Sequence, residues 1–395
     1  MIHRRYALVA GGGTGGHLVP AVTVAQALAA ARGEDAVEIV GSRRGLEGDL
    51  LAGTGLPVTT LPGRGFARSF GPRQMVANLG AVAALAWAGA MALSLLRRRR
   101  PAVVVAMGGY GCVPVSLAAA LLGIPVVLVN LDAVPGAASR LVGRFARAAA
   151  VAFPGTPLPR AVVTGAPVRP EIVAAAHPDA AARRRARRTL DLPPDRFVVG
   201  VVGGSLGAKT INEAALDLAA LWAGRGDVVV YHVVGRRDAA AMARSAPVAE
   251  AGGLVYRQVP YEDRMAAFYQ AADVVVGRAG ASTVAELAVI GVPAVLVPLP
   301  GAPGDHQTAN AGALAAAGGA VVLPDGQCSG RRLAAELEAL RSPPGRLDAM
   351  RQAAASLGRP DAVAAVVAVV ETHARSGPRP GGSVGAAPRA RHGAP

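Results

Sequence analysis

The sequence has few cysteines, few aromatic residues and almost no lysine. Cys112 and Cys328 are the only cysteines among 395 residues, and neither lies in a Cys-x-x-Cys motif or a cysteine–histidine cluster. This spacing predicts neither a disulfide framework nor a metal site, and it fits a reducing compartment. Because aromatic residues make up only 4% of the chain, alanine, valine, leucine and glycine must fill the core. That composition is typical of alternating strands and helices.

Acidic residues are outnumbered, and the formal net charge is +15, carried by arginine and by one lysine, Lys209. Two explanations stay open. The genome could encode its basic residues as arginine, or the protein could have a partner that carries phosphate groups or an anionic membrane surface. Residues 1–10 have too short an apolar run for a signal peptide.

The longest uncharged segment is Met75 to Leu96, and four arginines follow it at 97–100. Its length would allow a membrane span, but its alanines, glycines and polar residues make its hydropathy modest. A span would also split a predicted sheet, because strands are predicted on both sides of it. We therefore expect a buried or surface-lying helix. A helix resting on anionic lipid is intermediate between that case and insertion.

Short valine-rich runs alternate with helical segments rich in alanine and leucine. The runs are almost continuously apolar, as are strands buried on both faces of a parallel sheet. The predicted strands are Tyr6–Ala10, Ala36–Val40, Val58–Leu61, Val103–Ala106, Val126–Asn130 and Val162–Thr164, then Phe197–Val202, Val228–Val234, Leu254–Val259, Val274–Val276, Ala294–Val297 and Ala320–Leu323. The fold class is therefore α/β, with two Rossmann-like, doubly wound domains and an interdomain cleft.

The domain boundaries follow from composition. We place the first domain at residues 1–168, a linker at 169–195, the second domain at 196–358, a last helix at 359–375 and a disordered tail at 376–395. The linker contains five arginines between 183 and 188, which we interpret as an exposed helix. The tail is rich in glycine, proline, arginine and alanine, which is typical of disorder.

Four glycine-rich turns each follow a predicted strand and precede a helix, at 11–16, 108–111, 203–207 and 277–280. Glycine lets the backbone approach a ligand, and the helix start offers free N–H groups and a positive dipole end to an anion. The first turn satisfies G-x-G-x-x-G, but a dinucleotide site would want an acidic residue where Arg43 and Arg44 stand. An NADP site stays possible there, and a plain strand–helix turn stays possible at each position. Together, the two turns of the first half suggest a ligand with a diphosphate group.

His17 ends the first glycine turn at a predicted helix start. Because a cation is disfavoured there, a neutral imidazole is expected, which can accept a proton. A structural role stays open. So does a general base that is an unidentified carboxylate.

Polar side chains accompany the later turns. The Ser205 hydroxyl could bind a phosphate or cap its helix. Thr283 and Glu286 have the spacing of a capping box, but Glu286 could instead accept hydrogen bonds from a ribose diol, with a diphosphate at the helix start. The cluster Asp305–Asn310 suits sugar hydroxyls or a solvated loop.

In this order, the motifs resemble those of the MurG family of bacterial cell-wall synthesis, from about Tyr6 to about Thr372. The motifs that carry the resemblance are Gly12–Ala21, Met107–Gly111, Pro125–Leu128, Ala133–Gly136, Thr164–Arg169, Gly203–Ala208, Ala272–Glu286 and Asp305–Asn310. The resemblance implies the GT-B fold, with helix 359–375 completing the first domain. It implies an inverting glycosyltransferase that moves GlcNAc from UDP-GlcNAc to the MurNAc 4-hydroxyl of undecaprenyl-linked lipid I, which forms lipid II.

The resemblance also assigns residues and partners. Donor contacts are implied at Thr14, Gly15, Gly16, Asp132, Arg169, Ser205, the backbone of Glu262, Ala281, Ser282, Thr283, Val284, Ala285, Glu286, His306 and Gln307. Acceptor contacts are implied at His17, Gly108, Gly109 and Tyr110, with His17 as the catalytic residue. The resemblance implies no bound metal or cofactor and no nucleic-acid partner. It also implies a peripheral location on the cytoplasmic face of the cell membrane, through an anionic inner-leaflet surface, and here that role would fall to Arg64–Arg73 and the helix up to Arg100.

Two departures from the family pattern leave the sugar and the acceptor open. Val129–Asp132 stands where the family has His-Glu-Gln-Asn, so Asp132 replaces a sugar-contacting asparagine, and Leu206 replaces a glutamine. The alternatives are a glycosyltransferase with another lipid or natural-product acceptor, a UDP-GlcNAc 2-epimerase, and an inactive membrane scaffold.

Overall fold

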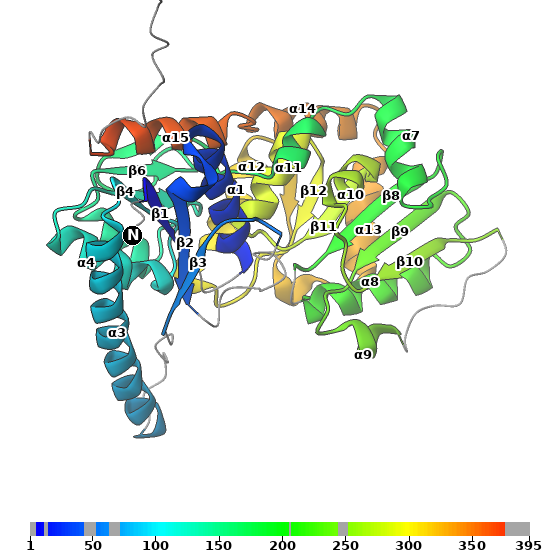
Figure 1. The fold of residues 1–395 in the computed structure, drawn as a ribbon. Coiled ribbons are helices and arrows are strands. Elements are labelled where there is room, and N and C mark those ends of the chain that lie inside the picture. Colours follow the sequence, from blue (N-terminus) through cyan, green and yellow to red (C-terminus); the bar gives the residue numbers. More distant parts are fainter. Residues whose placement is uncertain are drawn as a thin grey trace, which may run out of the picture.

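The computed structural model describes residues 5–11, 15–42, 53–62, 72–204, 207–243 and 252–375. Within these ranges the chain forms two parallel sheets that lie side by side, each flanked by helices (Figure 1). The predicted α/β class with two Rossmann-like domains is therefore confirmed.

The first sheet has seven parallel strands in the order β3-β2-β1-β4-β5-β6-β7. Its strands are β1 (Ala7–Ala10), β2 (Val37–Ser42), β3 (Val58–Leu61), β4 (Val103–Ala106), β5 (Val126–Asn130), β6 (Ala148–Val151) and β7 (Ala161–Val163). The second sheet has six parallel strands in the order β10-β9-β8-β11-β12-β13. They are β8 (Phe197–Val202), β9 (Val228–Val233), β10 (Val255–Val259), β11 (Val274–Gly277), β12 (Ala294–Leu296) and β13 (Ala320–Val322).

The helices connect these strands and cover both faces of each sheet. They are α1 (Gly15–Arg32), α3 (Pro72–Arg99), α4 (Val113–Leu121), α5 (Ala137–Gly143), α6 (Pro170–Ala174), α7 (Ala180–Thr189), α8 (Lys209–Leu221), α9 (Ala239–Ala243), α10 (Met265–Ala271), α11 (Ala281–Ile290), α12 (His306–Ala316), α13 (Gly330–Arg341), α14 (Arg346–Ser356) and α15 (Ala362–His373). Short 3₁₀ turns lie at η1 (Glu34–Ala36), η2 (Tyr110–Cys112), η3 (Pro303–Asp305) and η4 (Asp325–Gln327).

Each sheet is buried on both faces, which explains the continuous apolar runs of its strands. In β1, Val9 packs in one hydrophobic cluster and its neighbour Leu8 packs in the cluster on the opposite face. In β8, Val198 and Val199 divide in the same way. Successive side chains of a strand point to opposite faces, so a run of valines fills two core layers at once.

One strand, β6, was not predicted from the sequence. The segment Ala148–Val151 pairs with β5 and β7 as the fully buried strand β6. Its three alanines favour a helix by local propensity, and burial between neighbouring strands overrides that preference. All twelve predicted strands are present, and where their ends differ from the prediction they differ by one or two residues.

The linker contains the expected helix, but this helix is not exposed along its whole arginine run. Helix α7 carries the arginine run, but the Arg187 side chain is buried, and its guanidinium group bonds Asp273 and backbone carbonyls. After the second domain, α15 returns to the first (Figure 1), where Val366 and Val370 join the core beside α1. An ion pair of 2.7 Å between Arg32 of α1 and Glu371 of α15 supports this packing.

The segment that raised the question of a membrane span is helix α3, which stands out from the first domain in Figure 1. Its second half packs on α4 through Ala88, Ala92, Leu95 and Leu96. Among the described residues, no helix combines the length and the apolar character needed to cross a bilayer.

Candidate active site between the two domains

Two helix starts meet where the domains touch. The Ser282 hydroxyl, in the first turn of α11, donates a hydrogen bond of 3.1 Å to the backbone oxygen of Gly16, in the first turn of α1. The residue before α11 is Gly280, whose lack of a side chain leaves the first N–H groups of the helix without a side-chain cap. Two positive dipole ends therefore face one region, which favours an anionic ligand there.

A second contact joins the loop after β5 to helix α12. The Asn310 side chain donates a hydrogen bond of 2.9 Å to the Asp132 carboxylate and accepts one of 2.8 Å from the Ala133 backbone N–H. It also donates to the backbone oxygen of Ala279 at 3.2 Å. Asn310 is fully buried, and it holds the Asp132–Ala133 loop of the first domain against Ala279 of the second.

His17 lies within this region, in the first turn of α1. An added Cβ on Gly108 would come within 3.6 Å of the His17 ring, and Gly108 has a φ of 81°, a conformation that strains other residues. That distance is an ordinary contact, so the backbone conformation, and not the space beside the imidazole, favours glycine at 108. The His17 Nδ1 atom is buried and has no hydrogen-bond partner among the described residues.

The electrostatics of His17 favour the neutral form. Burial lowers its pKa below the ordinary value, the negative charge of Asp132 opposes this, and the neighbouring His306 adds to it. The cause that dominates is desolvation of the charged ring. A neutral imidazole with an unpaired ring nitrogen can accept a proton from a hydroxyl group.

Glu286 lies in the second turn of α11 and is 6% exposed. Its carboxylate accepts hydrogen bonds from the Arg169 guanidinium at 3.1 and 3.3 Å and from the Tyr269 hydroxyl at 3.0 Å. Burial raises the pKa of Glu286, although Arg169 and Tyr269 counteract this. The capping-box alternative is wrong, because the helix begins at Ala281 with Gly280 as its N-cap, and Glu286 turns to Arg169 instead.

Glu262, for which a backbone contact is predicted, has a side chain that is fully engaged within the second domain. Its buried carboxylate accepts hydrogen bonds from the Tyr231 hydroxyl and from the backbone N–H and guanidinium of Arg264, at 2.8 and 3.0 Å. Burial alone would raise the pKa of Glu262, but these hydrogen bonds lower it. A ligand contact through its backbone, as predicted, remains compatible with this arrangement.

A buried polar network lies behind the third glycine turn, and the sequence did not predict it. The imidazole of His232, on β9, bonds the Tyr256 hydroxyl at 2.7 Å and the Asn212 side chain at 3.0 Å. Asn212 donates in turn to Asp238 at 3.2 Å, and a Cβ on Gly207 would lie 2.5 Å from the Asp238 carboxylate. Burial lowers the pKa of His232 to about 4. The network therefore fixes the end of the glycine turn against β9.

The remaining predicted contacts are distributed as follows. Gly15 and Gly16 open α1, Ala281–Glu286 form the first turns of α11, and His306 and Gln307 open α12. Gly109 precedes η2, and the Tyr110 side chain is exposed. The Gln307 side chain accepts a 2.9 Å hydrogen bond from the Leu299 backbone. Thr14, Ser205, Leu206 and residues 64–71 lie outside the described residues, and so does the tail after Arg375.

No group of three or more potential metal ligands occurs in the part of the chain that the structure describes. The site offers cationic groups and helix starts instead, namely Arg169, α1 and α11. Such groups can stabilise negative charge on a ligand by fixed dipoles and hydrogen bonds.

Comparison with known proteins gives consistent matches along the chain. Residues 7–151 match the glycosyltransferase family 28 N-terminal domain, and residues 198–366 match the family 28 C-terminal domain. The UDP-N-acetylglucosamine–N-acetylmuramyl-(pentapeptide) pyrophosphoryl-undecaprenol N-acetylglucosamine transferase of Desulforudis audaxviator is 39% identical over 381 residues, which cover 94% of this chain and 99% of that protein. The transferase of the same name from Alkalilimnicola ehrlichii is 40% identical over 371 residues, with 93% and 99% coverage.

Solved structures agree with the fold. The crystal structure of Acinetobacter baumannii MurG superimposes with a TM-score of 0.70 at 28% identity, covering 93% of this chain and 99% of that one. The UDP-GlcNAc 2-epimerase from Neisseria meningitidis has a TM-score of 0.61 at 12% identity, with 93% and 99% coverage. The likeness to the epimerase is one of fold alone.

Proposed function

The chain belongs to glycosyltransferase family 28 and, within it, to the UDP-N-acetylglucosamine–N-acetylmuramyl-(pentapeptide) pyrophosphoryl-undecaprenol N-acetylglucosamine transferases, and from this premise we propose how its residues carry out the transfer. The reaction moves GlcNAc from UDP-GlcNAc to lipid I in peptidoglycan synthesis. The observation that carries this assignment is the identity of 39–40% over nearly the whole of the chain and of its relatives. The epimerase resembles the chain only in fold.

We propose that UDP-GlcNAc binds at the starts of α11 and α1, with its diphosphate on their free N–H groups. In the structure, Glu286 accepts hydrogen bonds from Arg169 and Tyr269. A ribose diol would replace Arg169 as the donor to Glu286, and the freed guanidinium would move to the diphosphate. This exchange keeps the Glu286 carboxylate and the Arg169 guanidinium paired before and after binding, which avoids the cost of an unsatisfied buried charge.

The chemical step we propose is a single displacement. The acceptor hydroxyl attacks the anomeric carbon as the bond to UDP breaks, and its proton passes to a ring nitrogen of His17. Negative charge builds on the leaving diphosphate, where Arg169 and the helix starts stabilise it without a bound metal or cofactor. The lowered pKa of His17 keeps its ring neutral and ready to accept the proton.

We further propose that the protein docks peripherally on the cytoplasmic face of the membrane through α3 and α4. Trp87 and Leu121 are 64% and 81% exposed on these two packed helices, and Leu117 is exposed one turn before Leu121. Arg97 and Arg98 are exposed at the end of α3. Exposed apolar side chains on two packed helices, with arginines at the end of one of them, suit an anionic lipid surface.

The decisive experiment is the purified protein with UDP-GlcNAc and a lipid I analogue, with released UDP and the disaccharide product measured together. Both products should appear in equal amounts, and only when the acceptor is present. Conversion of UDP-GlcNAc without acceptor would indicate an epimerase. Binding of neither substrate would leave the scaffold alternative.

A further inference from the structure

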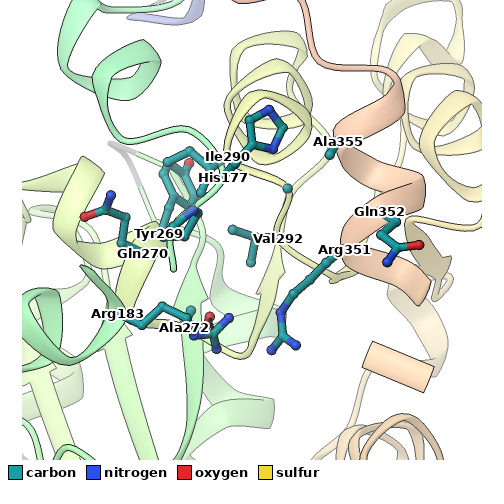
Figure 2. Close-up of a pocket in the computed structure, with 12 residues that line it drawn as sticks. His177, Arg183, Tyr269, Gln270, Ala272, Ile290, Val292, Arg351, Gln352 and Ala355 are labelled. Atoms are coloured by element: carbon teal, nitrogen blue, oxygen red, sulfur yellow. Dashed lines mark hydrogen bonds between the residues drawn. The ribbon is translucent and has the colours of Figure 1, made fainter. Parts of the chain in front are cut away.

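The second domain contains a pocket of about 210 Å³ that is separate from the contacts between the domains. It is lined by the α6–α7 connection, α7, α10, the end of α11 and α14, and Figure 2 shows its side chains. The pocket lies at the C-terminal end of α11, whereas the proposed donor site lies at its N-terminal end, about 15 Å away along a ten-residue helix. It therefore belongs to a different part of the domain from the donor site.

Positive charge is in excess on one side of this pocket. Three guanidinium groups share the Asp273 carboxylate: those of Arg183, of Arg187 at 2.8 Å and of Arg351 at 3.3 Å. Arg351 has a second partner, Asp348, but that side chain is 72% exposed. Burial lowers the pKa of Arg183 against the attraction of Asp273, and the charges of Arg351 and Arg187 lower it further.

One donor in this cluster is unused. The Nε atom of Arg351 is buried and has no hydrogen-bond partner among the described residues. Arg183 and Arg351 both line the pocket and reach it from opposite sides in Figure 2. The other side of the pocket is apolar and aromatic, with Tyr269, Ile290 and Val292. An anionic group attached to a small apolar body would match both sides.

We propose that this pocket is a binding site for a small organic anion, a carboxylate or phosphate monoester on a compact apolar group. Its anionic oxygens bond Arg351 and Arg183, as guanidinium groups bind such oxygens, and its body packs on Tyr269 and Val292. The volume is below the about 300–1,000 Å³ usual for drug-sized ligands, which sets the compact size.

The same geometry links the pocket to the donor site. The Tyr269 ring lines the pocket, while its hydroxyl donates to Glu286 at 3.0 Å. A bound anion holds this ring in place and so holds Glu286 where it meets the ribose. This second step rests on the proposed function, and it makes the ligand a positive effector of donor binding.

The test uses the full-length protein, with phenyl phosphate as the probe. Saturating UDP occupies the donor site, so that the probe cannot bind there, and calorimetry measures its Kd. Arg351→Gln should raise that Kd by about tenfold or more, the usual effect of losing a charge-assisted hydrogen bond. Gln352→Glu, an exposed change at the pocket rim, should also weaken binding. Arg346→Gln, exposed on the same helix but outside the pocket, is the matched control and should leave the Kd unchanged.

Coupling is measured as the Kd of UDP with and without saturating phenyl phosphate. The wild-type protein should bind UDP about fivefold more tightly with the probe, within the usual range of coupling between sites. Tyr269→Phe should keep probe binding and lose this gain. No probe binding, or equal Kd values in wild type and Arg351→Gln, would overturn the site. Equal UDP affinity with and without bound probe would overturn the coupling. A failure of UDP to bind at all would instead count against the proposed function.

Discussion

Replacing Glu286 by glutamine tests the donor site most directly. The residue is 6% exposed, and its carboxylate accepts three hydrogen bonds, two from Arg169 and one from Tyr269. Glutamine keeps the shape and one acceptor oxygen but loses the charge that a ribose diol would meet. A hydrogen bond to a charged group contributes about 1.5–3 kcal/mol, so KM for UDP-GlcNAc should rise about 10- to 150-fold. The ribose does not react, so kcat should change little.

The stability of the Glu286→Gln protein should change little, in contrast to its KM. Because burial raises the pKa of Glu286 in the folded protein, its contribution to stability is greatest at low pH and is lost as pH rises through the folded pKa. At neutral pH a neutral glutamine is therefore tolerated, and Arg169, which is partly exposed, can turn to water. The melting temperature should stay near that of the wild type.

The assay is initial-rate kinetics with varied UDP-GlcNAc at a fixed lipid I analogue, accompanied by thermal melts. Glu171→Gln is the matched control, because Glu171 is an exposed second partner of Arg169 at 3.6 Å. Exposed ion pairs contribute about 0–1 kcal/mol, so KM should change by less than about fivefold in that variant. An unchanged KM in Glu286→Gln, with the protein folded, would refute the ribose role of this carboxylate.

Three further predictions follow from the site and the surface. His17→Ala should lower kcat by about 100- to 10,000-fold with an unchanged Kd for UDP; turnover at the wild-type rate would remove His17 from proton transfer. The pKa of His232 is about 4 in the folded protein, against 6.5 in the unfolded chain. This difference contributes about 3 kcal/mol of stability, which is fully present above pH 6.5 and is lost as pH falls towards 4. Urea unfolding at several pH values should show a smaller acid loss in His232→Asn, and parallel curves would contradict the assignment. The double variant Trp87→Glu/Leu121→Glu should lower the fraction of protein that sediments with anionic phospholipid vesicles at least about tenfold. The control Leu221→Glu, on the second domain, should leave that fraction unchanged. Equal sedimentation of all variants would exclude α3 and α4 as the docking surface.

The sheets could be predicted from the sequence because parallel strands buried on both faces leave a plain signal. Valine-rich runs such as those of β4 and β8 pack in two core layers, so every position is apolar. Strand β6 gave no such signal, because alanine is small enough for a helix or a buried strand, and only its neighbours β5 and β7 decide between them. Local composition cannot report a partner that lies far along the chain.

The glycine turns could be predicted for a related reason, because glycine between a strand and a helix is itself the local signal of such a turn. Side-chain partners were harder to predict. The spacing of Thr283 and Glu286 fits a capping box, yet Glu286 pairs with Arg169 over a separation of 117 residues. The arginine run of α7 looks exposed in sequence, yet Arg187 is buried because Asp273 lies opposite it. Tertiary charge partners set these positions, and no local pattern encodes them.

Helix α11 connects the features on which the proposals depend. Its first turn meets α1 through Ser282 and Gly16, its second turn carries Glu286, and its C-terminal end, with Ile290, borders the cationic pocket. A ten-residue helix packed on both sides moves as one body, so a ligand at either end acts on the same element. The domains themselves are joined at its start and through Asn310 and Asp132. The proposed donor site, the domain contact and the pocket therefore share one helix, and the Tyr269–Glu286 hydrogen bond joins a residue that lines the pocket to the carboxylate of the proposed donor site.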